Sequence, residues 1–186
     1  MTRFAFCAVA ALALTACGSD NEAVDADGDG AISNEEAEVA AARVRPLEPG
    51  EYKMMMELIS IDDPSLSEQE IAQAKQFFGA MSEMAPPRCL TEEEAAKGMT
   101  GIAEGLQRGN CDTQSLTADE NGMQGTMICQ GQNGDARVEI DSTTTGTQSE
   151  MTMNVTEPAA NGGEKNVVMK IGMTRTGDCT TAPAGE

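Results

Sequence analysis

The sequence predicts an α+β fold: an antiparallel β-meander sheet, curved and half-barrel-like, with two short helices, preceded by a helical calcium-loop segment. From residue 110 onward, short runs of alternating apolar and polar residues are separated by Gly, Asn and Asp turns at hairpin spacing. Two capping boxes ahead of these runs each open a helix-forming stretch. Each expected strand has one apolar face, so we expect the sheet to pack on one side only.

Residues 1–16 are expected to be a signal peptide. Arg3 precedes an apolar run at 4–14, which is too short to span a membrane. The run ends in the sequence LTAC, whose last residue is Cys17, and this resembles a bacterial lipobox. The resemblance implies cleavage before Cys17, lipid attachment to its sulfur, and, with Gly18 next, sorting to the outer membrane facing the periplasm. An ordinary signal peptide with an unrelated cysteine is the alternative.

The acidic run DADGDGAISNEE at 25–36 matches the EF-hand calcium-loop pattern. Gly30 lies where the loop must turn sharply, and Ile32 is the apolar residue between ligands. Calcium prefers oxygen ligands. The expected ligands are the carboxylates of Asp25, Asp27, Asp29 and Glu36, the backbone carbonyl of Ala31, and Ser33 directly or through a water. No second such loop occurs in the sequence, so we expect weak binding, with a Kd of about 10⁻⁴–10⁻³ M. The alternative is an acidic, glycine-rich tether that binds no ion.

An Ala- and Glu-rich stretch at 35–44 is expected to form the helix that leaves this loop. Pro46 and Pro49 end it. The pattern therefore divides the chain into four segments. These are a signal peptide at 1–16, an anchor and calcium-loop segment at 17–44, a main α+β domain at 45–179, and a disordered tail at 180–186.

The main domain should begin with a strand at 51–61, because Tyr52, Met54, Met56 and Leu58 alternate along one face. Capping boxes that begin at Ser67 and Thr91 predict helices to about residues 81 and 107. The meander that follows is expected to contain strands at 111–117, 123–130, 135–143, 147–156 and 165–176.

Four cysteines remain after Cys7 and Cys17 are assigned to the signal peptide and the lipid: Cys89, Cys111, Cys129 and Cys179. An even number in an exported protein indicates two disulfides, with three possible pairings. We favour Cys111–Cys129, because these residues lie on two strands joined by a turn, and this leaves Cys89–Cys179. Zinc binding is the rival interpretation, which the absence of His and of closely spaced cysteines disfavours.

The charge balance excludes some partners. The chain carries 12 basic and 31 acidic residues, a net charge of −19, which argues against nucleic acid and against lying flat on anionic lipid. We expect no enzymatic activity, because there is no His, the cysteines are expected to be oxidised, and no carboxylate pair or phosphate loop is marked. The expected contacts are the membrane through the lipid, and an unidentified envelope protein.

Methionine alternates along the first and the last two expected strands. Such a face could hold an apolar or amphipathic ligand, because methionine adapts its shape. The methionines at 54–56, 151 and 153 also allow a Cu(I) site, since thioethers are soft ligands. A third interpretation is a purely structural envelope protein in which these methionines only fill the core. A cavity would favour ligand binding, and a filled core would favour the structural role.

Several segments together resemble one family. They are Arg45-Pro46 with Pro49-Gly50-Glu51-Tyr52, the run Pro87-Arg88-Cys89-Leu90-Thr91 with Ala95-Ala96, then Cys111, Thr126-Met127-Ile128-Cys129, and Gly177-Asp178-Cys179. With these segments, residues from about 45 to 179 resemble the family called domain of unknown function 3617. The family's opening aromatic is usually Trp, and here it is Tyr52. The resemblance implies a small exported bacterial protein with these four cysteines, and it supplies no catalytic residue.

Overall fold

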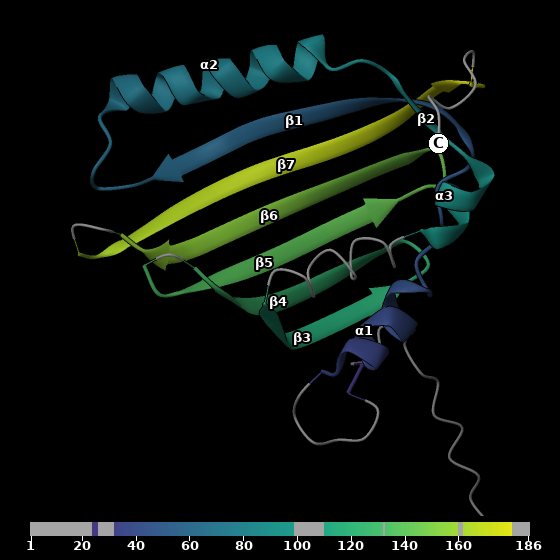
Figure 1. Ribbon diagram of the computed structural model, residues 1–186, viewed down its shortest axis with the longest axis horizontal. Helices are drawn as coiled ribbons and strands as arrows, with labels where there is room; N and C mark the ends of the chain where they lie inside the picture. Colours follow the sequence, from purple (N-terminus) through teal and green to yellow (C-terminus); the bar gives the residue numbers. More distant parts are fainter. Residues whose placement is uncertain (1–23, 26–31, 99–109, 132, 160–161, 180–186) are drawn as a thin grey trace, which may run out of the picture.

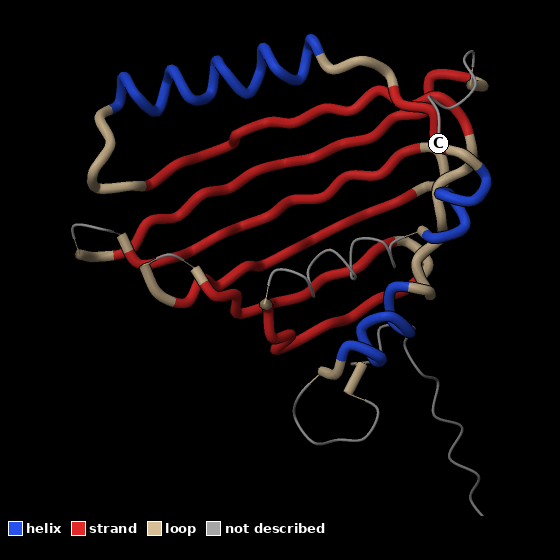
Figure 2. Tube along the Cα trace, viewed as in Figure 1, coloured by secondary structure: helices blue, strands red, loops and turns tan. Residues whose placement is uncertain are grey.

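The computed structural model describes residues 24–25, 32–98, 110–131, 133–159 and 162–179, which form one open antiparallel sheet with helices beside it (Figures 1 and 2). The described strands are β1 (Gly50–Asp62), β2 (Arg88–Leu90), β3 (Cys111–Asp119), β4 (Gly122–Gln130), β5 (Asp135–Thr144), β6 (Gln148–Pro158) and β7 (Glu164–Gly177). The described helices are α1 (Asn34–Ala41), α2 (Glu68–Met84) and α3 (Glu92–Lys97). The predicted α+β class with a meander sheet is confirmed.

The strand order is β2-β1-β7-β6-β5-β4-β3. From β3 to β7 each strand pairs with the next along the chain, and β1 completes the sheet by pairing with β7. The strands expected from alternation match β1 and β3–β7 closely. The sequence did not predict β2, which pairs with residues 50–52 of β1. A strand of three residues is too short to show the alternation of apolar and polar residues that marks a strand in the sequence.

Helices α2 and α3 begin where the capping boxes at Ser67 and Thr91 predict them, and α1 begins at a third capping box, at Ser33, that was not predicted. The side chains of Ser33, Ser67 and Thr91 each accept a hydrogen bond from the backbone of a glutamate three residues later. Helix α2 ends at Met84, just before Pro86, as expected from the proline. Helix α3 ends at Lys97, because Gly98 leaves the helical conformation with φ +50°, so it is shorter than the helix expected to residue 107. The rest of that stretch, from residue 99, lies outside the described residues. In the described part of the chain, no helix is long and apolar enough to cross a membrane.

The apolar core lies in two places. The larger cluster joins Val24 and α1 to the strands β3–β5. Its buried members are Val24, Ala40, Val44, Leu116, Ala118, Met123, Met127, Val138 and Ile140. The smaller cluster contains Tyr52, Leu90 and Ala95, with Leu47 and Met173 packed against it. The segment before residue 45 therefore shares a hydrophobic core with the sheet wherever the structure describes it.

The two disulfides pair the cysteines as favoured from the sequence. Cys111 and Cys129 lie directly opposite each other on β3 and β4, with Cα atoms 4.0 Å apart. Cys89 on β2 bonds to Cys179, just beyond β7, with a Cα separation of 5.4 Å. One disulfide lies toward each edge of the sheet. The Cys89–Cys179 disulfide lies beside the smaller core cluster, because Cys89 is next to Leu90 on β2.

Candidate functional site

The apolar face of β1, β6 and β7 carries half of the methionines of the domain. Met54 lies opposite Met173, and Met153 lies opposite Met169. We call the set Met54, Met56, Met151, Met153, Met169, Ile171 and Met173 the Met-lined face. All of these side chains are only partly buried. The corresponding residues of β5, Val138 and Ile140, are buried beneath the cluster that α1 joins.

A pocket of about 530 Å³ lies at one end of the Met-lined face. Met151, Ile171 and Met173 form part of its floor, together with polar residues at the end of β5. One wall is the connection from α1 to β1, at residues 44–47. The other wall comes from β2 and α3, through Arg88, Leu90 and residues 94–98. The pocket is therefore built by four separate segments of the chain, within residues 44–47, 88–98, 142–151 and 171–173.

The first wall is held in place by backbone hydrogen bonds. The Arg45 N–H donates to the Glu120 carbonyl (3.1 Å), and the Glu48 N–H donates to the Gly146 carbonyl (2.7 Å). The Arg45 guanidinium also forms an ion pair with the Glu120 carboxylate, at 3.2 Å. Gly146 has φ +88°, a conformation that strains other residues, and its position brings the β5–β6 turn against this wall.

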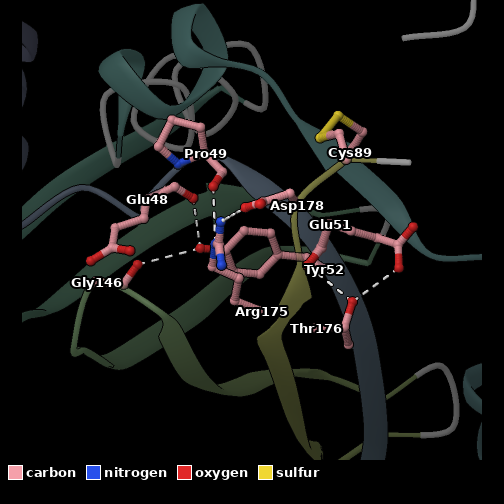
Figure 3. A network of polar contacts seen from close by, with 10 residues as sticks. Glu48, Pro49, Glu51, Tyr52, Cys89, Gly146, Arg175, Thr176 and Asp178 are labelled. Carbon is pink, nitrogen blue, oxygen red and sulfur yellow. Dashed lines mark hydrogen bonds and ion pairs between the residues drawn. A yellow bond between two sulfur atoms is a disulfide. The ribbon is translucent and has the colours of Figure 1, made fainter. Parts of the chain in front are cut away.

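Tyr52 anchors the same wall from inside the domain (Figure 3). Its side chain is fully buried, and its hydroxyl donates to the backbone carbonyls of Glu48 (2.7 Å) and Gly146 (3.3 Å). Burial raises the pKa of Tyr52, an effect that the nearby Arg175 partly opposes, so the phenol stays neutral and remains a donor. Arg175 donates from Nε to the Pro49 carbonyl at 3.0 Å. The connection from α1 to β1 is thus held by hydrogen bonds at Arg45, Glu48 and Pro49.

The second wall depends on the cap of α3. The Thr91 N–H donates to the Glu94 carboxylate at 3.0 Å, and the Arg88 guanidinium contacts it at 2.8 Å. These two interactions lower the pKa of Glu94, the first more than the second, and keep its carboxylate charged. A Cβ placed on Gly98 would lie 3.6 Å from Pro46, so the two walls lie against each other there.

The polar side chains on the floor of the pocket already have hydrogen-bond partners within the protein. The hydroxyl of Ser142 on the floor bonds to the backbone of Met123, and the Thr144 hydroxyl accepts from the Gly146 N–H. Among the described residues, no buried side-chain polar atom lacks a hydrogen-bond partner. A buried apolar group would therefore break no hydrogen bond here. The arrangement suits the apolar part of a small molecule.

The expected calcium loop is described only at its two ends. Asp27, Asp29 and Ala31 lie outside the described residues, as does the expected lipid attachment site Cys17. At the far end, the Glu36 carboxylate accepts from both the N–H and the hydroxyl of Ser33, each at 2.8 Å. The described residues contain no cluster of three His, Cys, Asp or Glu side chains suited to a metal.

Both ends of that loop are attached to β3. The Val24 N–H donates to the Leu116 carbonyl at 3.3 Å, and Ile32 forms a β-bridge with Thr113. Val24 is buried, and Asp25, the first expected ligand, directly follows it. EF-hand loops usually pair with a second loop, which this sequence does not offer. Here Ile32 pairs with β3 instead. This attachment could not be foreseen from the motif, because it depends on which strand forms the edge of the sheet.

A comparison with family models decides what kind of domain this is. Residues 47–179 match the model described as "Protein of unknown function (DUF3617)". The chain belongs to this family. The match confirms the resemblance found in the sequence, and it includes the sheet, α2, α3 and both disulfides. Among the pocket residues, only Val44, Arg45 and Pro46 precede the matched DUF3617 region. No curated protein and no solved structure matches the chain.

Sequence reasoning named the Met-lined face but missed the charged residues around the pocket. Arg45, Arg88 and Lys97 come from the α1–β1 connection, β2 and α3 respectively. Nothing in their local sequence distinguishes them from solvated surface charges. The available signal was the pair of capping boxes and prolines that place these segments at turns, and this signal does not say which turns meet.

Proposed function

We propose that this DUF3617 domain is a binding module, not an enzyme, and that the pocket at the end of the Met-lined face holds an apolar or amphipathic small molecule. The observation that carries the proposal is the pocket itself. Its volume of about 530 Å³ falls within the range of about 300–1,000 Å³ that ligand sites occupy. Its lining combines apolar side chains with polar and charged ones, as such sites do.

Partial burial of the methionines supports ligand binding over a purely structural role. If Met151, Ile171 and Met173 only filled a core, we would expect them to be buried as Ile140 is. Methionine has three rotatable bonds and a polarisable sulfur, so a face built from it adjusts to ligands of different shape. The facing methionines on β1, β6 and β7 also keep Cu(I) as an alternative occupant.

The test is a titration with N-phenylnaphthylamine, a neutral probe whose emission rises in apolar surroundings. We expect saturable binding with one site for each chain. Met151→Trp should weaken that binding strongly by filling the pocket, while Met55→Trp should leave it unchanged, because Met55 is exposed on the opposite face. Non-saturable binding, or equal effects of the two variants, would contradict the proposal and favour a structural role.

We further propose that the domain is anchored at the outer membrane and faces the periplasm. The lipobox-like sequence ending at Cys17 supports this, as does the pair of disulfides, which is typical of an oxidising compartment. A lipid anchor would keep the pocket close to the membrane, where apolar molecules and envelope proteins are concentrated. Incorporation of labelled palmitate into the full chain, abolished by Cys17→Ala, tests the anchor.

Calcium binding at 25–36 is a second candidate function. The motif supports it, and so does the attachment of both loop ends to β3, which places Asp25 and Ser33 on a fixed support. Because Glu36 stands three residues after the helix cap Ser33, its carboxylate is held near the loop by the capping box.

Calorimetric calcium titration of the chain without its signal sequence tests this second function. We expect saturable binding near the weak limit of about 10⁻³ M, abolished by Glu36→Gln and retained in the neighbouring Glu35→Gln. Gln can still complete the capping box, so the first variant should keep α1 folded. Unsaturated heats several times above that concentration would identify the loop as an acidic tether.

A further inference from the structure

We propose that the ligand of the pocket carries an anionic head on a single apolar chain, and that Arg45, Arg88 and Lys97 bind the head. This inference rests on the proposed binding function and names its ligand class. The lining contains these three cationic side chains and two carboxylates, Glu94 and Glu150. Over the whole chain the balance is the reverse, with 12 basic and 31 acidic residues.

The carboxylates of the lining are already engaged. The Glu150 side chain forms an ion pair with Lys170 at 2.7 Å, and Glu94 is bound by the cap of α3 and by Arg88. Neither is placed to attract a second cation. Every charged side chain of the lining is in an ion pair, so charge is locally balanced at the pocket, although the protein as a whole is strongly acidic.

The cations are available for exchange. Arg45 pairs with Glu120, Arg88 with Glu94 and Lys97 with Glu93, and all six side chains are at least one-third exposed. Exposed ion pairs contribute only about 0–1 kcal/mol, so a ligand carboxylate or phosphate could share or replace such a partner at little cost. At an ionic strength of about 0.15 M, charges beyond about 8 Å are screened, so the acidic residues elsewhere on the chain add little repulsion at these cations.

The two parts of the pocket thus match the two parts of an anionic amphiphile. The floor of Met151, Ile171 and Met173 offers apolar contact with no unmet hydrogen bond, and the walls present guanidinium and ammonium groups. A neutral apolar molecule would use only the floor. A zwitterion or a cation would bring a positive charge to Arg45, Arg88 and Lys97.

The experiment compares laurate with dodecanol, which has the same chain length and no charge. Calorimetry with the chain lacking its signal sequence should show laurate binding about tenfold more tightly, with the difference shrinking as salt is added. Lauryl phosphate, measured in parallel, distinguishes a carboxylate head from a phosphate head. Tighter binding of either anion than of dodecanol supports the inference.

Arg88→Gln tests the role of the cations, with Arg137→Gln as the matched control. Arg137 forms a similar ion pair with Glu139 but does not line the pocket. We expect Arg88→Gln to weaken laurate binding up to about fivefold while dodecanol binding stays unchanged, which also shows that the fold is intact. Equal affinities for laurate and dodecanol, unaffected by Arg88→Gln, would overturn the anionic ligand but keep the pocket. Failure of both molecules to bind would overturn the proposed function itself.

Discussion

The two ends of the sheet have the same alternating sequence pattern and different burial. Along β5, every second residue from Ala136 to Thr144 is buried, because α1 and Val24 lie over the neighbouring strands. Along β6 and β7 most residues are only partly buried. Among described elements, the main helix contacts are α1 with β3 and α2 with β1, and Figure 1 shows α2 beside the sheet rather than across β6. One end is a well-packed core, and the other has a partly exposed apolar face with a pocket at its end.

The largest effect should come from a charge placed under α1. Ala40 is fully buried between α1 and the sheet, so Ala40→Asp would force an unpaired carboxylate into the larger core cluster. We expect loss of cooperative thermal unfolding for the whole domain. The adjacent Val39 is 55% exposed, and Val39→Asp should leave the melting temperature nearly unchanged. A stable sheet in Ala40→Asp would show that the segment before residue 45 folds separately.

The disulfides allow a second comparison of the two ends. Cys89–Cys179 closes a separation of 90 residues, and Cys111–Cys129 closes only 18. Loop-closure entropy predicts a loss of about 4–5 kcal/mol for replacing the first pair with alanine and about 3 kcal/mol for the second. Denaturant unfolding of the two double variants measures the difference. If the shorter bridge proved the more important, packing around Cys111 would outweigh chain entropy.

Cavity-forming substitutions should distinguish the ends more finely. Ile140→Ala in the larger cluster should destabilise the domain by about 2–5 kcal/mol, as is usual for a buried side chain. Met169→Ala on the Met-lined face should cost about half as much, because its side chain is already partly exposed. Urea unfolding of both variants gives the comparison. Equal losses would indicate that the Met-lined face is as well packed as the other end.

Acid should loosen the pocket wall slightly, before it affects the larger cluster. The backbone N–H of Thr91, and then Arg88, hold the pKa of Glu94 below its ordinary value of 4.5. This stabilisation is therefore present above pH 4.5 and is lost as the pH falls through the lower folded-state pKa. In Glu94→Gln the melting temperature should fall less steeply over that range, whereas the exposed neighbour variant Glu92→Gln should follow the parent. Parallel curves for Glu94→Gln and the parent would contradict the assignment.

These differences explain which features the sequence could predict. Strand positions follow from alternation and turns, and the starts of α2 and α3 follow from the caps at Ser67 and Thr91, because these signals are local. The pairing of Cys111 with Cys129 follows from neighbouring strands. The pocket was not foreseeable, since Arg45, Arg88 and Lys97 line one pocket only when separate turns fold together. The docking of α1 depends on Ala40 and Val44, whose small apolar side chains would fit many surfaces.

One further consequence concerns association between copies of the chain. Open sheets expose two outer strands whose unpaired N–H and C=O groups can add strands from another molecule. On β1, β2 covers residues 50–52, and farther along α2 lies beside the strand, where Ser82 accepts the N–H of Met56 at 3.0 Å. On β3, Val24 and Ile32 occupy backbone positions on the strand. Both margins of this sheet are thus partly blocked, which protects the protein from fibre-like stacking where many copies crowd together.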